Sequence, residues 1–130
     1  MLIFGHRFIK SENFFHIIDI DALKKTPPSS TIYVEFCEEN LDIINYLDTN
    51  SVAFALKVSN IKELIYASAL NAAYALVSKE FAKSAQDIAE NYLFDTKILV
   101  FIESEEEIEE MALLGIDGVL FTSNIIKINS

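Results

Sequence analysis

The chain has 130 residues, of which 20 are acidic and 10 are basic, so its formal net charge is −10. This length fits one domain with its own hydrophobic core and is too short for two ordinary domains. The negative charge repels nucleic-acid phosphates and anionic lipid surfaces, so we expect neither nucleic acid nor a membrane as a partner.

Apolar residues make up 52% of the sequence, but charged residues interrupt every apolar run, and none reaches the roughly 20 residues of a membrane helix. The first residues do not have the pattern of a secretory signal peptide. The single cysteine, Cys37, cannot form an internal disulfide. We therefore expect a cytoplasmic protein. The apolar surplus predicts a homodimer, because a small monomer has little interior in which to hide it.

The first 30 residues predict two strands, Leu2–Ile9 and Phe14–Ile20, joined by Lys10–Asn13 as an N-terminal β-hairpin. One helical turn over Asp21–Lys25 is expected before a break at Thr26–Ser30, which contains two prolines. This segment is interpreted as an extra sheet edge, a lid or a dimer arm.

From residue 31 onward, β-branched and aromatic runs alternate with amphipathic stretches at a period of about 20–25 residues, which predicts repeated βα units and a mostly parallel five-stranded sheet with flanking helices. The runs are almost continuously apolar, as is typical of strands covered on both faces. The predicted strands are Thr31–Phe36, Val52–Val58, Ala73–Val77, Lys97–Ile102 and Gly118–Phe121.

Between these strands, apolar residues recur at intervals of three and four, so each set defines one helix face. Ser104–Glu107 and Asn60–Glu63 have the spacing of a capping box at a helix start. Asn50, Asn71 and Gly115 stand where helices are expected to end in the left-handed conformation. The apolar sets are Leu41, Ile44 and Leu47; Ile61, Leu64 and Ile65; Ala82, Ala85, Ile88, Ala89 and Tyr92; and Ile108, Met111 and Ala112.

The segment Lys97–Phe121, with the sequence KILVFIESEEEIEEMALLGIDGVLF, resembles a strand–helix–strand unit of a TIM-type βα barrel or of a response-regulator receiver domain. A full TIM barrel has eight such units, and this chain has room for about five. The barrel resemblance therefore implies a half-barrel or an open sheet.

The receiver resemblance implies an acidic pair, a phospho-accepting aspartate, a hydroxyl and a lysine at successive strand ends. Glu38 and Glu39 imitate the pair and Ser104 the hydroxyl, but Ser78 stands at the accepting position and residues 121–122 at the lysine position. The resemblance thus implies a pseudo-receiver that cannot take phosphate on aspartate.

Three charged residues at predicted strand ends, Glu35, Lys57 and Glu103, are the candidate catalytic residues. A desolvated lysine at a strand end can form a Schiff base while a neighbouring carboxylate carries the proton, as in several barrel aldolases. The alternative is a structural salt bridge on the rim of the sheet. The three glycines match neither a dinucleotide fingerprint nor a P-loop, so no cofactor is expected.

His6 and His16 are predicted to lie opposite each other on the hairpin, where Glu12 or Asp19 would complete only a weak metal motif, so no metal is expected. Cys37 is followed by two glutamates, whose charge raises the pKa of a thiol. We interpret it as a buried, inert cysteine.

Three functions stay open at this point. The first is a non-catalytic dimeric module that acts as an adaptor or accessory protein. The second is a small lyase or aldolase-like enzyme that uses Lys57 with Glu35 or Glu103. The third is a pseudo-receiver that regulates a kinase or a transcription partner.

Overall fold

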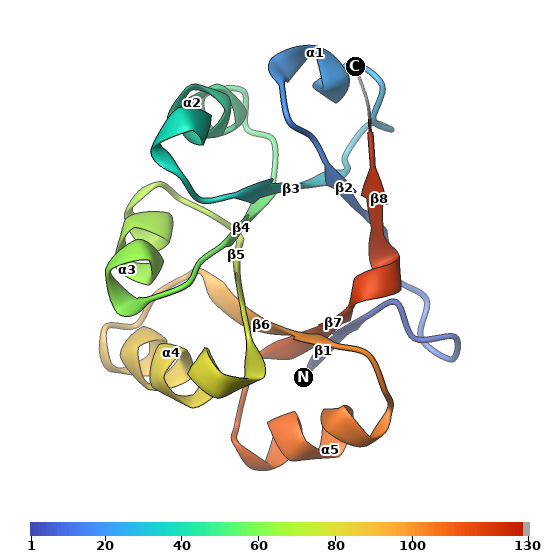
Figure 1. Cartoon of the computed structure of the whole chain (residues 1–130), viewed down its shortest axis with the longest axis vertical. Coiled ribbons are helices and arrows are strands. Elements are labelled where there is room, and N and C mark those ends of the chain that lie inside the picture. Colours follow the sequence, from blue (N-terminus) through green and yellow to red (C-terminus); the bar gives the residue numbers. More distant parts are fainter. Residues whose placement is uncertain (129–130) are drawn as a thin grey trace.

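A single sheet of parallel strands forms the centre of the molecule and curls on itself (Figure 1). The computed structural model describes residues 1–128 of the chain. The order in space is β1-β7-β6-β5-β4-β3-β2-β8, and every hydrogen-bonded pair is parallel. In chain order the eight strands are β1 (Leu2–Phe4), β2 (Phe14–His16), β3 (Thr31–Glu35), β4 (Phe54–Lys57), β5 (Tyr74–Val77), β6 (Lys97–Ile102), β7 (Gly118–Phe121) and β8 (Ile125–Lys127).

The α-helices lie on the outside of the curl, and each follows one of the strands β2 to β6 (Figure 1). Two short 3₁₀ helices follow β3 and β7. Within the described residues, no helix is long and apolar enough to cross a membrane. The helices are α1 (Ile20–Leu23), η1 (Glu38–Asn40), α2 (Leu41–Thr49), α3 (Ile61–Ala69), α4 (Lys79–Asn91), α5 (Glu106–Leu113) and η2 (Thr122–Asn124).

The five strands predicted from residue 31 onward correspond to β3–β7, and their ends agree within two residues. The predicted sheet is corrected in two respects: it has eight strands, and all of them are parallel. The curled parallel sheet fits the half-barrel that the barrel resemblance implied. The strand β8 was missed because three residues directly after η2 are too few to form a pattern.

The predicted N-terminal hairpin is wrong. Strand β1 pairs with β7, whereas β2 lies between β3 and β8. Gly118 explains part of this choice, because a Cβ atom there would lie 2.7 Å from the Cβ of Leu2. Only glycine lets β1 approach β7 so closely, which makes β7 the partner of β1.

Aromatic side chains fill the inside of the curl. The rings of Phe4 and Phe14 lie 5.0 Å apart, and each lies 5.6 Å from the ring of Tyr74 on β5. Tyr33 and Phe101 also meet, at 6.2 Å. The inside is therefore a packed core and not a channel, as in larger βα barrels. The buried members of this cluster, one from each strand β1–β7, are Phe4, Phe14, Tyr33, Ala55, Leu76, Leu99 and Leu120.

The two ends of the sheet come round toward each other without backbone pairing between them (Figure 1). We call the gap between β1 and the β2–β8 pair the seam. The Phe4–Phe14 ring contact crosses it. The buried Asn124 also crosses it, because its side-chain amide donates a 3.0 Å hydrogen bond to the carbonyl oxygen of Glu12. Side chains therefore close the seam.

The helix ends follow the predicted capping in most places. The amide of Glu63 donates to Asn60 Oδ1 at 2.9 Å, and the Glu63 carboxylate accepts from the amide of Ser59 at 2.8 Å. Asn71 and Gly115 have the predicted left-handed backbone, with φ of 69° and 75°. Near α2, the left-handed residue is Ser51 and not Asn50.

We predict that Phe14→Ala lowers the free energy of unfolding by about 3–5 kcal/mol, because it empties a fully buried site at the centre of the aromatic cluster. Phe8→Ala is the control, since Phe8 is 74% exposed, and should change stability by less than about 0.5 kcal/mol. Urea denaturation of both variants measures the difference. Equal losses would show that the ring cluster does not hold the sheet closed.

Candidate functional site

All strands point the same way, so their carboxyl ends gather at one end of the curl, which we call the mouth. In βα barrels this end carries the active site. Glu35 and Lys57 are the last residues of β3 and β4 and are register partners. Register partners in a parallel pair project to the same face, so these two side chains are neighbours at the mouth.

Glu103 directly follows β6 and shares a hollow with Lys57. This hollow has a volume of about 320 Å³, and Glu35 is not among the residues that line it. Glu35, Lys57 and Glu103 are all exposed. The predicted candidates thus meet at one end of the molecule, with Lys57 placed between two carboxylates that lie on different sides of it. The remaining lining residues are Ser78, Lys79, Glu80, Phe101, Ile102, Glu107 and Thr122.

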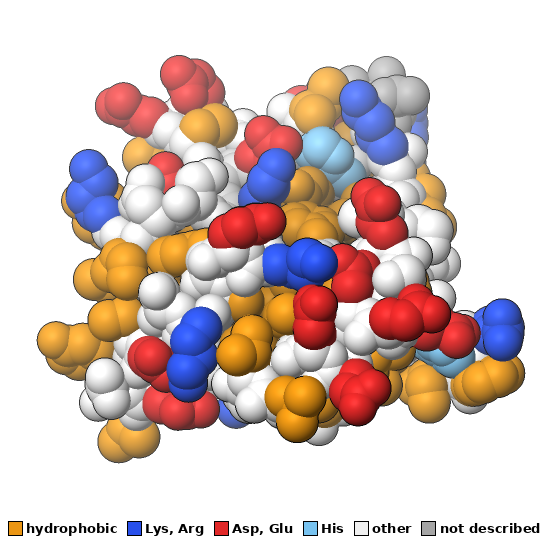
Figure 2. Space-filling view, turned by 60° about the horizontal axis from the view of Figure 1, so that its bottom comes forward, with side chains coloured by type: hydrophobic (Ala, Val, Ile, Leu, Met, Phe, Trp, Pro, Cys, Tyr) orange, Lys and Arg blue, Asp and Glu red, His pale blue; other side chains and the backbone are white. Residues whose placement is uncertain are grey.

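The predicted salt bridge on the rim is not present at Lys57, which forms no ion pair with any residue of the described part of the chain. The neighbouring Lys79 is paired, with its ammonium 2.9 Å from Glu107 and 3.7 Å from Glu110. The two lysines of the hollow therefore differ: Lys79 ties α4 to α5, and Lys57 is available to a ligand. Figure 2 shows how acidic and basic side chains intermingle with hydrophobic ones on one face of the molecule.

Glu107 organises the loop that carries Glu103. Its carboxylate accepts hydrogen bonds from the amide of Glu103 at 2.7 Å and from the amide of Ser104 at 3.0 Å. The Glu103 hydrogen bond, then the Lys79 ammonium, then the Ser104 hydrogen bond lower the pKa of Glu107 to about 2. The capping box predicted at Ser104–Glu107 is confirmed in this contact, which fixes one wall of the hollow.

The other half of the mouth holds a cluster that sequence reasoning missed. His16, the last residue of β2, is the register partner of both Tyr33 and Lys127. Its ring stands nearly perpendicular to that of Tyr33, with centroids 4.7 Å apart. Burial lowers the pKa of His16, Glu35 opposes this shift, and Lys127 adds to it. Burial and then the charge of Glu35 raise the pKa of Tyr33 to about 12.

The strand alternation that places Phe14 inside also places His16 at the mouth, because residues two apart share a face. This signal was available in the sequence. It had no use without knowing that β2 lies beside β3 and β8. Glu35 therefore has histidine and tyrosine neighbours as well as Lys57, which the three-residue candidate set did not include.

His6 lies elsewhere, and its predicted place opposite His16 is wrong. Its Nε2 atom is 2.8 Å from Glu105 Oε1, and Arg7 reaches the same oxygen at 3.7 Å. These contacts attach the loop after β1 to the start of α5. Among residues 1–128, no three histidine, cysteine, aspartate or glutamate side chains are grouped so as to hold a metal ion.

Cys37 lies just after β3 and is partly exposed, so the expectation of a buried thiol is wrong. The expected direction of its pKa is confirmed. Desolvation is the largest cause of the raised pKa, and the hydrogen bond with Glu39 is the next. A raised pKa disfavours the thiolate, which makes Cys37 a poor nucleophile.

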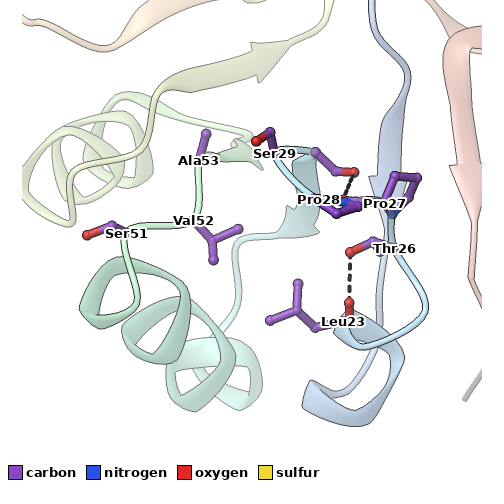
Figure 3. Close-up of a pocket in the computed structure, with 9 residues that line it drawn as sticks. Leu23, Thr26, Pro27, Pro28, Ser29, Ser51, Val52 and Ala53 are labelled. Carbon is purple, nitrogen blue, oxygen red and sulfur yellow. Dashed lines mark hydrogen bonds between the residues drawn. The ribbon is translucent and has the colours of Figure 1, made fainter.

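A larger hollow, of about 540 Å³, lies at the opposite end of the sheet, where the chain enters β3 and β4 (Figure 3). Its hydroxyl groups serve the loop itself: Thr26 Oγ1 donates to the carbonyl oxygen of Leu23 at 2.7 Å, and Ser30 Oγ donates to that of Pro27. Prolines, serines and small apolar side chains line the rest, without a charged group. We assign this hollow no chemistry.

The low pKa of Glu107 predicts an acid-sensitive contribution to stability. Its ordinary pKa of 4.5 applies to the unfolded chain and a pKa of about 2 to the folded one. The contribution is thus complete above pH 4.5, declines as the pH falls, and is absent below about pH 2. Glu107→Gln should lower stability at neutral pH and flatten its decline in this window.

Urea denaturation at several pH values measures this effect. Glu109→Gln is the matched control, because Glu109 is an exposed residue of the same helix and loses the same charge. An acid limb that is equally steep in Glu107→Gln and in Glu109→Gln would contradict the assigned role of Glu107.

Comparison of the sequence with protein-family models found no match, and comparison with curated proteins found none either. What the chain does must therefore be inferred from its own side chains and their placement.

Proposed function

We propose that this chain is a non-catalytic interaction module that self-associates, serving as an adaptor or accessory protein. The observation that carries the proposal is the exposure of large apolar side chains on the outside of a molecule whose inside is full. Phe8, Tyr92, Leu93 and Leu113 are 70–85% exposed. Exposed apolar side chains of this size are typical of surfaces that contact another protein.

The filled interior supports this choice. Aromatic rings occupy the space inside the curl, and the strand-to-helix connections at β4, β5 and β6 contain few residues. A catalytic lysine gains reactivity by losing contact with water. Lys57 is exposed, so the mouth lacks the enclosure that this chemistry needs.

Leu93 adds a second line of support. It follows α4 with a left-handed backbone, φ 54°, and is 85% exposed. This conformation costs an L-residue about 1–2 kcal/mol, and glycine or asparagine is the usual occupant. A leucine in this position is unfavourable both for the backbone and for contact with water, which supports a role in contact with another molecule.

We predict that the purified protein sediments with a mass that rises toward twice the monomer mass as its concentration increases. The physical reason is that two copies remove exposed apolar surface from water when they meet. Sedimentation velocity over a wide concentration range is the measurement. The monomer mass at every concentration would refute self-association.

A second candidate is carbonyl chemistry at the mouth, which is favoured by one observation: Lys57, Glu103 and a hollow of about 320 Å³ occur together. The Nζ atom of Lys57, as free amine, would add to a carbonyl carbon to give a carbinolamine. Glu103, as the acid, would protonate the departing hydroxyl, so that water leaves and a Schiff base forms. Glu35 is the alternative proton carrier on the neighbouring strand.

Borohydride trapping tests this candidate, because hydride reduces a Schiff base to a stable secondary amine. The protein is incubated with pyruvate or with glyceraldehyde, reduced and mapped by mass spectrometry. The enzyme candidate predicts an adduct at Lys57 that exceeds those at other lysines and disappears in Lys57→Arg but not in Lys62→Arg. No adduct, or equal adducts at all lysines, would contradict it.

A regulatory role of the pseudo-receiver type stays a prediction from the resemblance. In its support, Ser78 occupies the end of β5 and the N-cap of α4, where an accepting residue would lie. A kinase or transcription partner that co-purifies with the intact chain would favour this role.

A further inference from the structure

Strand β1 has a bonded neighbour on one side only. The amide of Leu2 donates to the carbonyl oxygen of Asp117 at 2.9 Å, so even-numbered residues of β1 bond to β7. Backbone groups alternate in direction along a strand, which turns the N–H and C=O of Ile3 toward the seam. The amide of Gly5 agrees with this alternation, since it donates to Ser11 Oγ at 3.0 Å.

The seam contains a hollow of about 640 Å³ along this free edge, lined by Met1–Phe4 and Ile9–Glu12. Met1, Leu2 and Ile9 are exposed beside it. Edge strands of soluble proteins are usually protected by a lysine, a proline, a bulge or a covering segment. Residues Leu2–Phe4 carry no charge and no proline, so this edge is open to another strand.

The charge of this surface favours a second copy of the chain. Lys10 and Glu12 line the hollow and cancel each other, and Arg7 is paired with Glu105. The whole chain has a formal charge of −10, so two copies repel each other over most of their surface. The seam is locally neutral and offers both signs of charge, which a two-fold contact can match.

The other exposed apolar side chains are less suited to this contact. Tyr92, Leu93 and Leu113 lie at or just beyond the ends of α4 and α5, where no strand edge is present. The seam combines apolar side chains, unpaired strand edge and matched charge. These are the components of recognition by strand addition, in which the main chain supplies hydrogen bonds and side chains supply contact area.

We propose that β1 of one copy pairs antiparallel with β1 of a second copy, about a two-fold axis near Ile3. The two Ile3 residues exchange both of their N–H···O=C hydrogen bonds, as residues of a hydrogen-bonded antiparallel pair do. The same surface is used by both copies, so the assembly closes as a dimer and does not extend. This inference rests on the proposed self-association and names its interface.

Hydrogen exchange of the wild-type protein tests the interface directly. The amide of Ile3 is unpaired in the monomer and bonded in the dimer. Its exchange rate should fall at least about tenfold between a concentration at which sedimentation shows monomer and one at which it shows dimer. The amide of Leu2, bonded within the copy, serves as the internal reference.

Two variants support the measurement. Ile3→Pro removes the amide that faces the seam and leaves the Leu2 bond to β7, and an edge strand tolerates proline at such a position. It should be monomeric at concentrations where Ile3→Val forms dimers. Leu93→Asn removes an exposed apolar side chain from another face while suiting the left-handed backbone, and it should dimerise like the wild type.

The outcomes separate the two proposals. Monomer at all concentrations refutes self-association and with it this interface. A dimer in which the Ile3 amide exchanges at the monomer rate, or which Leu93→Asn abolishes, keeps self-association and overturns the seam. The wild-type exchange measurement decides the question even where Ile3→Pro does not fold.

Discussion

Three aromatic rings, from β1, β2 and β5, hold the ends of the curled sheet together at a place where no backbone pairing does so. The rings of Phe4, Phe14 and Tyr74 contact one another at centroid distances of 5.0–5.6 Å. Such contacts add to the burial of large apolar surface. The position of β1, the shape of the seam and the filled interior all depend on this cluster.

The same cluster limits what the mouth can do. In a βα barrel the inward side chains form layers, and chemistry takes place on loops beyond the last layer. Here the connecting loops are short and the last inward residues, including Glu35 and Lys57, reach solvent directly. The mouth has charged groups in proximity but little enclosure. This favours binding at the outer surface over catalysis inside.

The mouth is nevertheless well ordered by electrostatic contacts. Glu107 binds two backbone amides and Lys79, which fixes the loop of Glu103 and joins α4 to α5. Glu105 holds His6 and Arg7, which attaches the loop after β1 to the same helix. The acidic helix α5 thus anchors both sides of its neighbourhood. The seam next to it is left neutral, unlike the rest of the chain.

The sequence by itself determined the repeated βα units, because the periodicity of apolar residues and the caps of each helix are local properties. It therefore predicted β3–β7, helices α2–α5 and the capping contact of Glu107. It also placed Glu35, Lys57 and Glu103 at strand ends that share one edge of the sheet, although not the hollow that only two of them line.

Only the tertiary structure decided which distant strands pair. The partner of β1 depends on Gly118, more than a hundred residues away, and the partner of β8 depends on how far the sheet curls. Neither interaction leaves a periodic signal near the strand it positions. The place of His16 beside Tyr33 and Glu35, and the free edge at Ile3, follow from those pairings and were for the same reason beyond local patterns.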